Sequence, residues 1–163
     1  MSIEARAAMT LDVLTVGPEE TVASVAQKMV QRAVSAVPVV DAEGKLLGML
    51  SEGDVMRHFG AEYQDRRSRW LAQIAEGQKL APDFLEYVRL DKQHAKDLMT
   101  APVITASPDA RLSEIADLLL SKKVKRVPIV EAGKLVGVVS RADLMRRIVE
   151  SPDDLIDALV DPN

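Results

Sequence analysis

Gly48-Met-Leu-Ser-Glu-Gly-Asp54 occurs a second time in the chain as Gly137-Val-Val-Ser-Arg-Ala-Asp143. Each copy is an apolar segment that ends in serine, and an aspartate follows three residues after the serine. A short apolar run predicts a buried strand, and serine with an acidic residue three positions later is typical of a helix start. The repeated stretch therefore predicts two strands that each lead directly into a helix.

The duplication extends far beyond these two stretches. When Met9 is aligned with Met99, identical residues recur along both halves, and after a one-residue deletion opposite Glu43 the agreement continues to Arg57 and Arg146. A duplicated segment of this length indicates two copies of one structural unit. The identical pairs include Met9/Met99, Thr10/Thr100, Thr15/Thr105, Pro38/Pro128, Gly48/Gly137, Ser51/Ser140 and Asp54/Asp143.

Each copy is predicted to form a β-α-β-β-α unit. Thr21 is available as the N-cap of the first long helix, whereas Arg111 takes that place in the second copy and is a poorer cap. The elements expected in the first copy are a strand over 13–16, a helix over 22–33, strands over 36–40 and 46–51, and a helix over 52–59. Those expected in the second copy are a strand over 103–105, a helix over 112–120, strands over 126–130 and 135–140, and a helix over 141–149.

A three-stranded sheet with helices on one face leaves its other face apolar and bare, so one copy alone would expose that surface to water. Two copies can cover each other. This predicts an α/β (α+β) fold in which two β-α-β-β-α repeats pack sheet to sheet with pseudo-twofold symmetry. The repeated methionines, including Met56 and Met145, are expected in the core. The predicted division is a first repeat over 7–59, a helical aromatic-containing insertion over 60–94, a second repeat over 95–149 and an acidic tail over 150–163.

Composition argues against several classes of function. The chain of 163 residues has 21 basic and 25 acidic residues, and its net charge of -4 gives no general attraction to nucleic acid or to an anionic membrane. There is no cysteine, and His58 and His94 are too few for most zinc sites, so we expect no metal site. The first residues lack a secretory signal, and no apolar run approaches the roughly 20 residues that span a bilayer. We therefore expect a cytoplasmic protein.

Ser51 and Asp54, like Ser140 and Asp143, stand together at a predicted helix start. Free main-chain N–H groups and a hydroxyl favour a phosphate there, and a carboxylate can accept hydrogen bonds from the two hydroxyls of a ribose. The glycine three residues before each serine would let a ligand or a backbone approach closely. The same residues also form a capping box that merely closes the helix start. The two roles are compatible, and both stay open at this point.

The repeated residues include Ala7-Ala-Met-Thr10 and Asp97-Leu-Met-Thr100, the Thr15 and Thr105 strands, the strands Ala36-Val-Pro38 and Arg126-Val-Pro128, and the two Gly-x-x-Ser-x-x-Asp segments. As a set, they resemble a pair of cystathionine β-synthase (CBS) domains, an arrangement known as a Bateman module. The resemblance implies a regulatory module that binds AMP, ADP or ATP between the paired copies, with S-adenosylmethionine or NAD as less favoured ligands. It also makes a homodimer plausible.

The family pattern implies that Asp54 and Asp143 hold ribose hydroxyls, that Ser51 and Ser140 contact phosphate, and that each cleft combines residues of both copies. One cleft would combine Thr15, Ser35, Ala36 and Val37 with Ser140 and Asp143. The other would combine Thr105, Lys125, Arg126 and Val127 with Ser51 and Asp54. Only the second cleft has a basic pair beside the adenine, so we expect it to prefer a more highly phosphorylated ligand. The alternative for Lys125 and Arg126 is a solvated edge-strand pair that discourages aggregation.

Every aromatic residue of the chain lies between Phe59 and Tyr87. Helices are expected there over 65–75 and 82–90, and we interpret their apolar stripes as an interface for self-association or for a partner. Nucleic-acid binding through Arg66-Arg-Ser-Arg-Trp70 is a weaker alternative, because basic and acidic side chains balance within this insertion.

No catalytic arrangement emerges from the sequence. The first glycine before Ser51 is one residue too far away for a G-x-S-x-G nucleophile elbow, and no P-loop or dinucleotide fingerprint is present. We therefore expect a sensor without catalytic residues that acts on itself or on an unidentified regulated protein. The alternative is a structural interaction and dimerisation module whose clefts hold no ligand.

Overall fold

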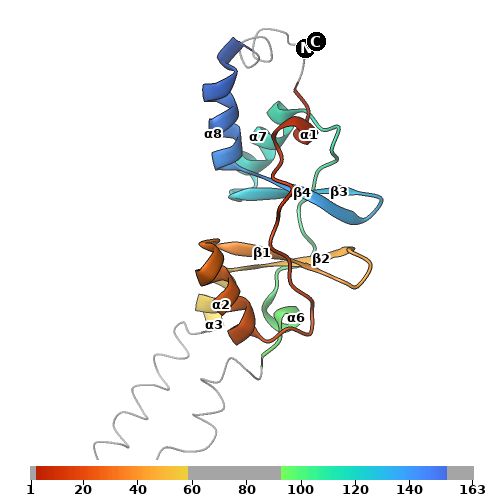
Figure 1. Cartoon of the computed structure of the whole chain (residues 1–163), viewed down its shortest axis with the longest axis vertical. Helices are drawn as coiled ribbons and strands as arrows, with labels where there is room; N and C mark the ends of the chain where they lie inside the picture. Colours follow the sequence, from red (N-terminus) through yellow and green to blue (C-terminus); the bar gives the residue numbers. More distant parts are fainter. Residues whose placement is uncertain (1–2, 59–92, 154–163) are drawn as a thin grey trace, which may run out of the picture. The chain divides into compact units, whose positions relative to one another are not determined.

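The computed structural model describes residues 3–58 and 93–153 (Figure 1). The helices expected over 65–75 and 82–90, the Arg66–Trp70 cluster and most of the acidic tail therefore lie outside the described residues. The elements, in chain order, are α1 (Ala5–Ala8), α2 (Val22–Arg32), β1 (Ala36–Val40), β2 (Leu46–Ser51), α3 (Glu52–His58), α6 (Ala95–Leu98), α7 (Leu112–Ser121), β3 (Arg126–Glu131), β4 (Lys134–Ser140) and α8 (Arg141–Glu150).

The chain folds as two compact units, and each unit contains segments of both repeats. Among the described residues, the β1–β2 unit consists of 14–42, 47–58 and 93–102, whereas the β3–β4 unit consists of 3–13, 43–46 and 103–153. Each short opening helix, α1 or α6, thus belongs to the unit built around the other repeat. The repeat boundaries 7–59 and 95–149 describe duplication in the sequence and stay a prediction, because the units are defined by spatial contact.

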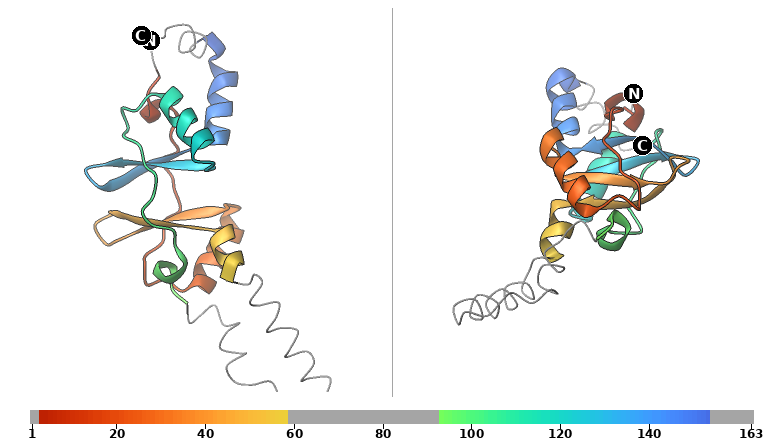
Figure 2. Two further views of the ribbon diagram at one scale, coloured as in Figure 1. Left: turned by 180° about the vertical axis from the view of Figure 1, so that it is seen from behind. Right: turned by 60° about the horizontal axis from the view of Figure 1, so that its bottom comes forward.

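In the β1–β2 unit, helices α2, α3 and α6 lie on one face of the β1–β2 hairpin (Figure 2). Helix α2 begins as predicted, because Thr21 Oγ1 accepts a hydrogen bond from Ser24 N at 3.2 Å. The helix ends at Arg32, and Ala33, its C-cap, has a left-handed conformation. The buried core of this unit consists of Val16, Val25, Met29, Val37, Val39, Leu50 and Ala95.

In the β3–β4 unit, helices α1, α7 and α8 lie on one face of the antiparallel β3–β4 hairpin (Figure 1). Helix α7 starts at Leu112, and the side chain of its N-cap residue Arg111 forms no capping bond. Glu114 Oε2 accepts a hydrogen bond from Arg111 N at 2.9 Å and so satisfies one free donor. Both halves thus contain the predicted helix, hairpin and helix, which confirms the mixed α/β class. The packing of one sheet on the other stays a prediction. The core of this unit consists of Ala5, Leu112, Ile115, Leu119, Val127, Ile129 and Val139.

The prediction of strands over 13–16 and 103–105 is wrong, because the chain forms only a single bridge at each place. Val16 forms one parallel bridge with Val39, and Ala106, one residue beyond the expected range, forms one with Ile129. Pro18 and Pro108 lie in turns two residues after these bridges. Because the chain turns there, the pairing does not continue into a ladder.

A second bridge closes the free edge of each hairpin. Met49 N donates to Thr100 O at 3.0 Å, and Thr100 N donates to Met49 O at 2.8 Å. Gly48 lies against this segment, since a Cβ at Gly48 would lie 2.6 Å from Met99 Sδ and 3.0 Å from Thr100 O. Gly48 therefore permits the close approach of Met99 and Thr100, which belong to the same chain. The matching contact in the β3–β4 unit involves Gly137, Met9 and Thr10.

The expected burial of two methionines is wrong. Met56 is 63% exposed and Met145 is 59% exposed. The aspartate two positions earlier faces the interior in each helix, so the methionine turns outward. Val30 and Leu120, at matching positions of α2 and α7, are also exposed. Val30 and Met56 in one unit thus match Leu120 and Met145 in the other, and Val149 of α8 is exposed as well.

Candidate ligand-binding site

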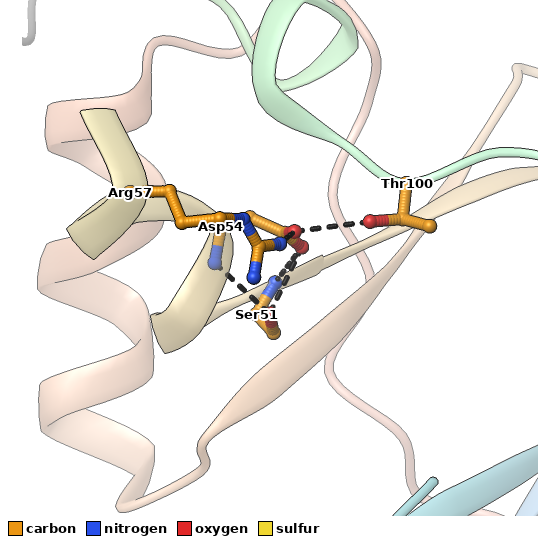
Figure 3. Close-up of polar contacts among 4 residues, drawn as sticks. All are labelled: Ser51, Asp54, Arg57 and Thr100. Carbon is orange, nitrogen blue, oxygen red and sulfur yellow. Dashed lines mark hydrogen bonds and ion pairs between the residues drawn. The ribbon is translucent and has the colours of Figure 1, made fainter. Parts of the chain in front are cut away.

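Strand β2 ends at Ser51 and α3 begins at the next residue, which places Ser51 and Asp54 on one corner (Figure 3). Asp54 Oδ2 accepts hydrogen bonds from Ser51 N and Ser51 Oγ, both at 2.9 Å. Asp54 N donates back to Ser51 Oγ at 3.2 Å. These reciprocal bonds form a capping box, so the structural role that the sequence left open is confirmed.

The second carboxylate oxygen of Asp54 also has protein partners. Asp54 Oδ1 accepts a hydrogen bond from Thr100 Oγ1 at 3.0 Å and forms an ion pair with Arg57 (Figure 3). The side chain of Asp54 is 5% exposed, whereas that of Arg57 is 71% exposed. The carboxylate at this corner is thus nearly buried, and it pairs with the long, exposed side chain of Arg57 from the same helix.

The β3–β4 unit repeats this arrangement. Asp143 Oδ2 accepts hydrogen bonds from Ser140 N at 2.8 Å and from Ser140 Oγ at 2.9 Å. Asp143 Oδ1 accepts from Thr10 Oγ1 at 3.2 Å and from Arg146 Nη1 at 3.3 Å. The Asp143 side chain is 8% exposed. The chain therefore contains two carboxylates with the same kinds of partner, each able to accept from a hydroxyl group.

Main-chain bonds bring two further predicted residues to these corners. Glu52 N donates to Ser35 O at 2.9 Å, and Arg141 N donates to Lys125 O at 3.2 Å. The residue that precedes β1 or β3 therefore contacts the first residue of the helix that follows the hairpin in its own unit.

The other predicted residues lie on strands or near bridges. Val37 and Val127 are fully buried, so their side chains contribute to packing. The crossed clefts expected from the sequence combine residues of different units and stay a prediction. Of the remaining residues, Thr15, Ala36 and Arg126 are partly buried, and Thr105 and Lys125 are exposed.

Four residues of these corners were not predicted from the sequence as part of the site: Thr10, Thr100, Arg57 and Arg146. All four belong to identical pairs of the duplication, and this was the available signal. Identity between copies shows that a residue type is retained at both positions, but it does not reveal the partner.

An apolar hollow of about 440 Å³ lies in the β1–β2 unit between α2 and α3. Ser35 and Glu52 line it beside the Ser51 corner, and the other lining residues are Ala26, Met29, Val30, Ala33, Val34, Val55 and Met56. Within residues 3–58 and 93–153, no three histidine, aspartate or glutamate side chains are grouped so that they could hold a metal ion. No helix in the same part of the chain has the length and apolar character needed to cross a bilayer.

The family model for the CBS domain matches residues 5–61 and 95–150, more than half of the chain. The uncharacterized protein MJ1426 of Methanocaldococcus jannaschii is 32% identical over 124 residues, which are 71% of this chain and 74% of that protein. Inosine-5'-monophosphate dehydrogenase of the same organism is 28% identical over 137 residues, which are 83% of this chain and 22% of the enzyme.

Solved structures share the fold. CBSX2 of Arabidopsis thaliana, solved in complex with AMP, superposes with a TM-score of 0.70 at 23% identity and covers 91% of this chain and 98% of its own. The CBS domain pair of MJ0100, solved with 5'-methylthioadenosine and S-adenosyl-L-methionine, gives a TM-score of 0.65 at 20% identity over 93% and 99%. At these identities the likeness shows a common fold.

Proposed function

Because this chain belongs to the CBS domain family, we propose that it is a regulatory module that binds an adenosine-type ligand and acts, in the cytoplasm, on itself or on a partner. The observation that carries the proposal is the pair of nearly buried aspartates, Asp54 and Asp143, each beside a serine at a helix start. Such a carboxylate can accept from ribose hydroxyls. Structures of the same fold have been solved with AMP and with S-adenosyl-L-methionine, and all these ligands contain adenosine.

The proposed clefts are those expected from the sequence. One would combine Ser140 and Asp143 with Thr15, Ser35, Ala36 and Val37, and the other would combine Ser51 and Asp54 with Thr105, Lys125, Arg126 and Val127. We favour AMP, ADP or ATP as the ligand over S-adenosylmethionine and NAD. A regulated partner is supported by the match to 22% of a dehydrogenase, because the matched segment is a small part of that enzyme.

Binding of adenosine, AMP, ADP, ATP, S-adenosylmethionine and NAD to the full chain, measured by isothermal titration calorimetry, tests this proposal. The double variant Asp54→Asn and Asp143→Asn should lose about tenfold or more in affinity, because the amide nitrogen that takes the place of Oδ1 donates hydrogen bonds and cannot accept them. Asparagine keeps an oxygen for the helix cap, and thermal unfolding without ligand checks that the fold persists. The exposed Asp109→Asn is the control. Unchanged nucleotide binding in the double variant would overturn the site, and no binding by the wild type up to about 1 mM would overturn the function.

We also propose that the chain forms a homodimer, which keeps the alternative function of an interaction module open. The specific observation is the pair of exposed apolar residues that both units retain, Val30 with Met56 and Leu120 with Met145. We propose that a second copy of the chain covers these residues. Two copies carry the same exposed apolar pairs, and an interface between identical chains joins surfaces that both copies have. Aromatic contacts from the insertion and nucleic-acid binding through Arg66–Trp70 concern residues outside the described part of the chain.

A further inference from the structure

The acceptor positions of Asp54 are all taken by protein donors. A carboxylate offers about four lone-pair positions, two on each oxygen. In Asp54, Oδ2 accepts from the N and Oγ of Ser51, and Oδ1 accepts from Thr100 and Arg57. A ribose hydroxyl can therefore donate to this carboxylate only if one of these four donors leaves. The same holds for Asp143 with Ser140, Thr10 and Arg146.

The four donors are not held equally. The two bonds from Ser51 join the end of β2 to the start of α3, and Thr100 is fixed by two main-chain hydrogen bonds to Met49. Arg57 reaches Asp54 from three residues along the same helix, and its side chain is 71% exposed. A long exposed side chain regains water and rotamer freedom when it leaves, so its bond is the least costly to break. Arg146, 64% exposed, has the corresponding position in the other unit.

We propose that Arg57 and Arg146 compete with the ribose hydroxyls of the ligand for Oδ1 of Asp54 and Asp143, and so set the affinity of each corner for a nucleoside. This inference rests on the proposed function. The competing bond is an ion pair, whereas the bond that replaces it has an uncharged donor. Salt screens this ion pair through its exposed arginine, although less than it would screen a pair in which both groups are exposed, and it has little effect on an uncharged nucleoside. Binding of adenosine should therefore strengthen as the salt concentration rises.

The experiment uses adenosine as the probe, because it has the ribose hydroxyls and lacks the phosphates that would attract arginine by themselves. Calorimetry compares the wild-type chain with the double variant Arg57→Ala and Arg146→Ala at low and at high salt. The variant should bind adenosine about two to five times more tightly at low salt, the range expected for loss of an ion pair whose arginine is exposed. Its affinity should also lose the salt dependence seen in the wild type. The charge-matched control is Lys122→Ala with Lys134→Ala, which removes two exposed lysines and should change neither property.

The outcomes distinguish failure of arginine competition from failure of the proposed function. If the wild type binds adenosine and the Asp54→Asn, Asp143→Asn variant does not, the function stands. Equal or weaker adenosine binding by the folded arginine variant, or the same salt dependence as the wild type, would then overturn competition alone. If the wild type binds neither adenosine nor AMP, the proposed function and this inference are overturned together.

Discussion

Thr100 donates its hydroxyl to Asp54 Oδ1 at 3.0 Å although 46 positions separate the two residues in the chain. Thr10 makes the matching bond to Asp143 at 3.2 Å across 133 positions. Each threonine comes from the opening segment of one repeat, and each aspartate lies in the hairpin-to-helix corner of the other. The candidate ligand carboxylates are thus held by the segments that the two repeats exchange.

Replacing Thr100 by valine keeps the shape of the side chain and removes its hydroxyl. The nearly buried Asp54 then loses one donor, so we expect the free energy of unfolding to fall by about 1 kcal/mol, with an upper bound near 2 kcal/mol. Urea denaturation followed by circular dichroism measures the change. Thr105→Val, at an exposed threonine, serves as the control and should stay within about 0.5 kcal/mol of the wild type. Equal stability of the two variants would contradict a structural role for the Thr100 bond.

Gly48→Ala tests the close approach of the opening segment to β2. The new Cβ would lie 2.6 Å from Met99 Sδ and 3.0 Å from Thr100 O, so a side chain and a backbone must both shift. Overpacking of this kind costs about 1–3 kcal/mol. Gly17→Ala is the matched control, because a Cβ there meets nothing within 4 Å, and its effect should be within about 0.5 kcal/mol. In a double variant of Gly48→Ala with Met99→Ala, the second substitution should relieve part of the cost of the first. Denaturation of the wild type, the two single variants and the double variant gives the coupling energy.

The features that could be predicted from the sequence depend on residues that are close together in the chain. The Thr21 cap of α2 and the Ser–Asp capping boxes each join residues three positions apart, and the hairpins depend on adjacent apolar runs. The exchange of opening segments could not be predicted, because a contact between distant residues leaves no periodic pattern. Identity of Thr10 with Thr100 showed only that both copies retain the residue. The exposure of Met56 was also missed, because an apolar residue at helical spacing fits a core and an interface equally well.

The ion pair between Glu20 and Lys28 should make a contribution to stability that depends on pH. Burial raises the pKa of Glu20, but hydrogen bonds from Lys28 and Ser24 and the charge of Lys28 outweigh it, so its pKa lies below the ordinary value of 4.5. A lowered pKa in the folded state means that the ionised group stabilises the fold above the unfolded pKa, and this stabilisation is lost as the pH falls through the folded pKa.

Lys28→Met should therefore destabilise the chain by about 1 kcal/mol near pH 7 and by progressively less as the pH falls below 4.5. Urea denaturation across this pH range measures the difference. In Ser24→Ala with Lys28→Met, burial becomes the dominant influence, and a titration of Glu20 followed by NMR should show its pKa above the ordinary value. A difference that is independent of pH in the Lys28 variant would count against this ion pair, and Lys122→Met supplies the control for loss of a lysine.

Met56→Glu with Met145→Glu tests the proposed dimer. Both methionines are exposed on helices, and two carboxylates placed in an apolar interface would each have to be desolvated. Light scattering after size-exclusion chromatography should give the mass of a dimer for the wild type and of a monomer for the variant. Leu11→Glu is the matched control, since Leu11 is 71% exposed and lies outside the helices. A monomeric wild type at about 100 µM, or a variant that keeps the mass of a dimer, would contradict the interface.

Arg126→Ala tests whether the two proposed clefts differ in their preference for phosphates. Lys125 and Arg126 precede and begin β3, whereas Ser35 and Ala36 have these positions at β1. Guanidinium can pair with phosphate through two hydrogen bonds, so its loss should weaken ATP binding by about tenfold and AMP binding by about twofold or less. Calorimetry with both nucleotides measures the ratio. The reciprocal variant, Ala36→Arg, should raise the preference for ATP in the other cleft. If Arg126→Ala leaves the ratio of ATP to AMP affinity unchanged, the basic pair belongs to a solvated strand edge, which is the role that Lys and Arg commonly have there.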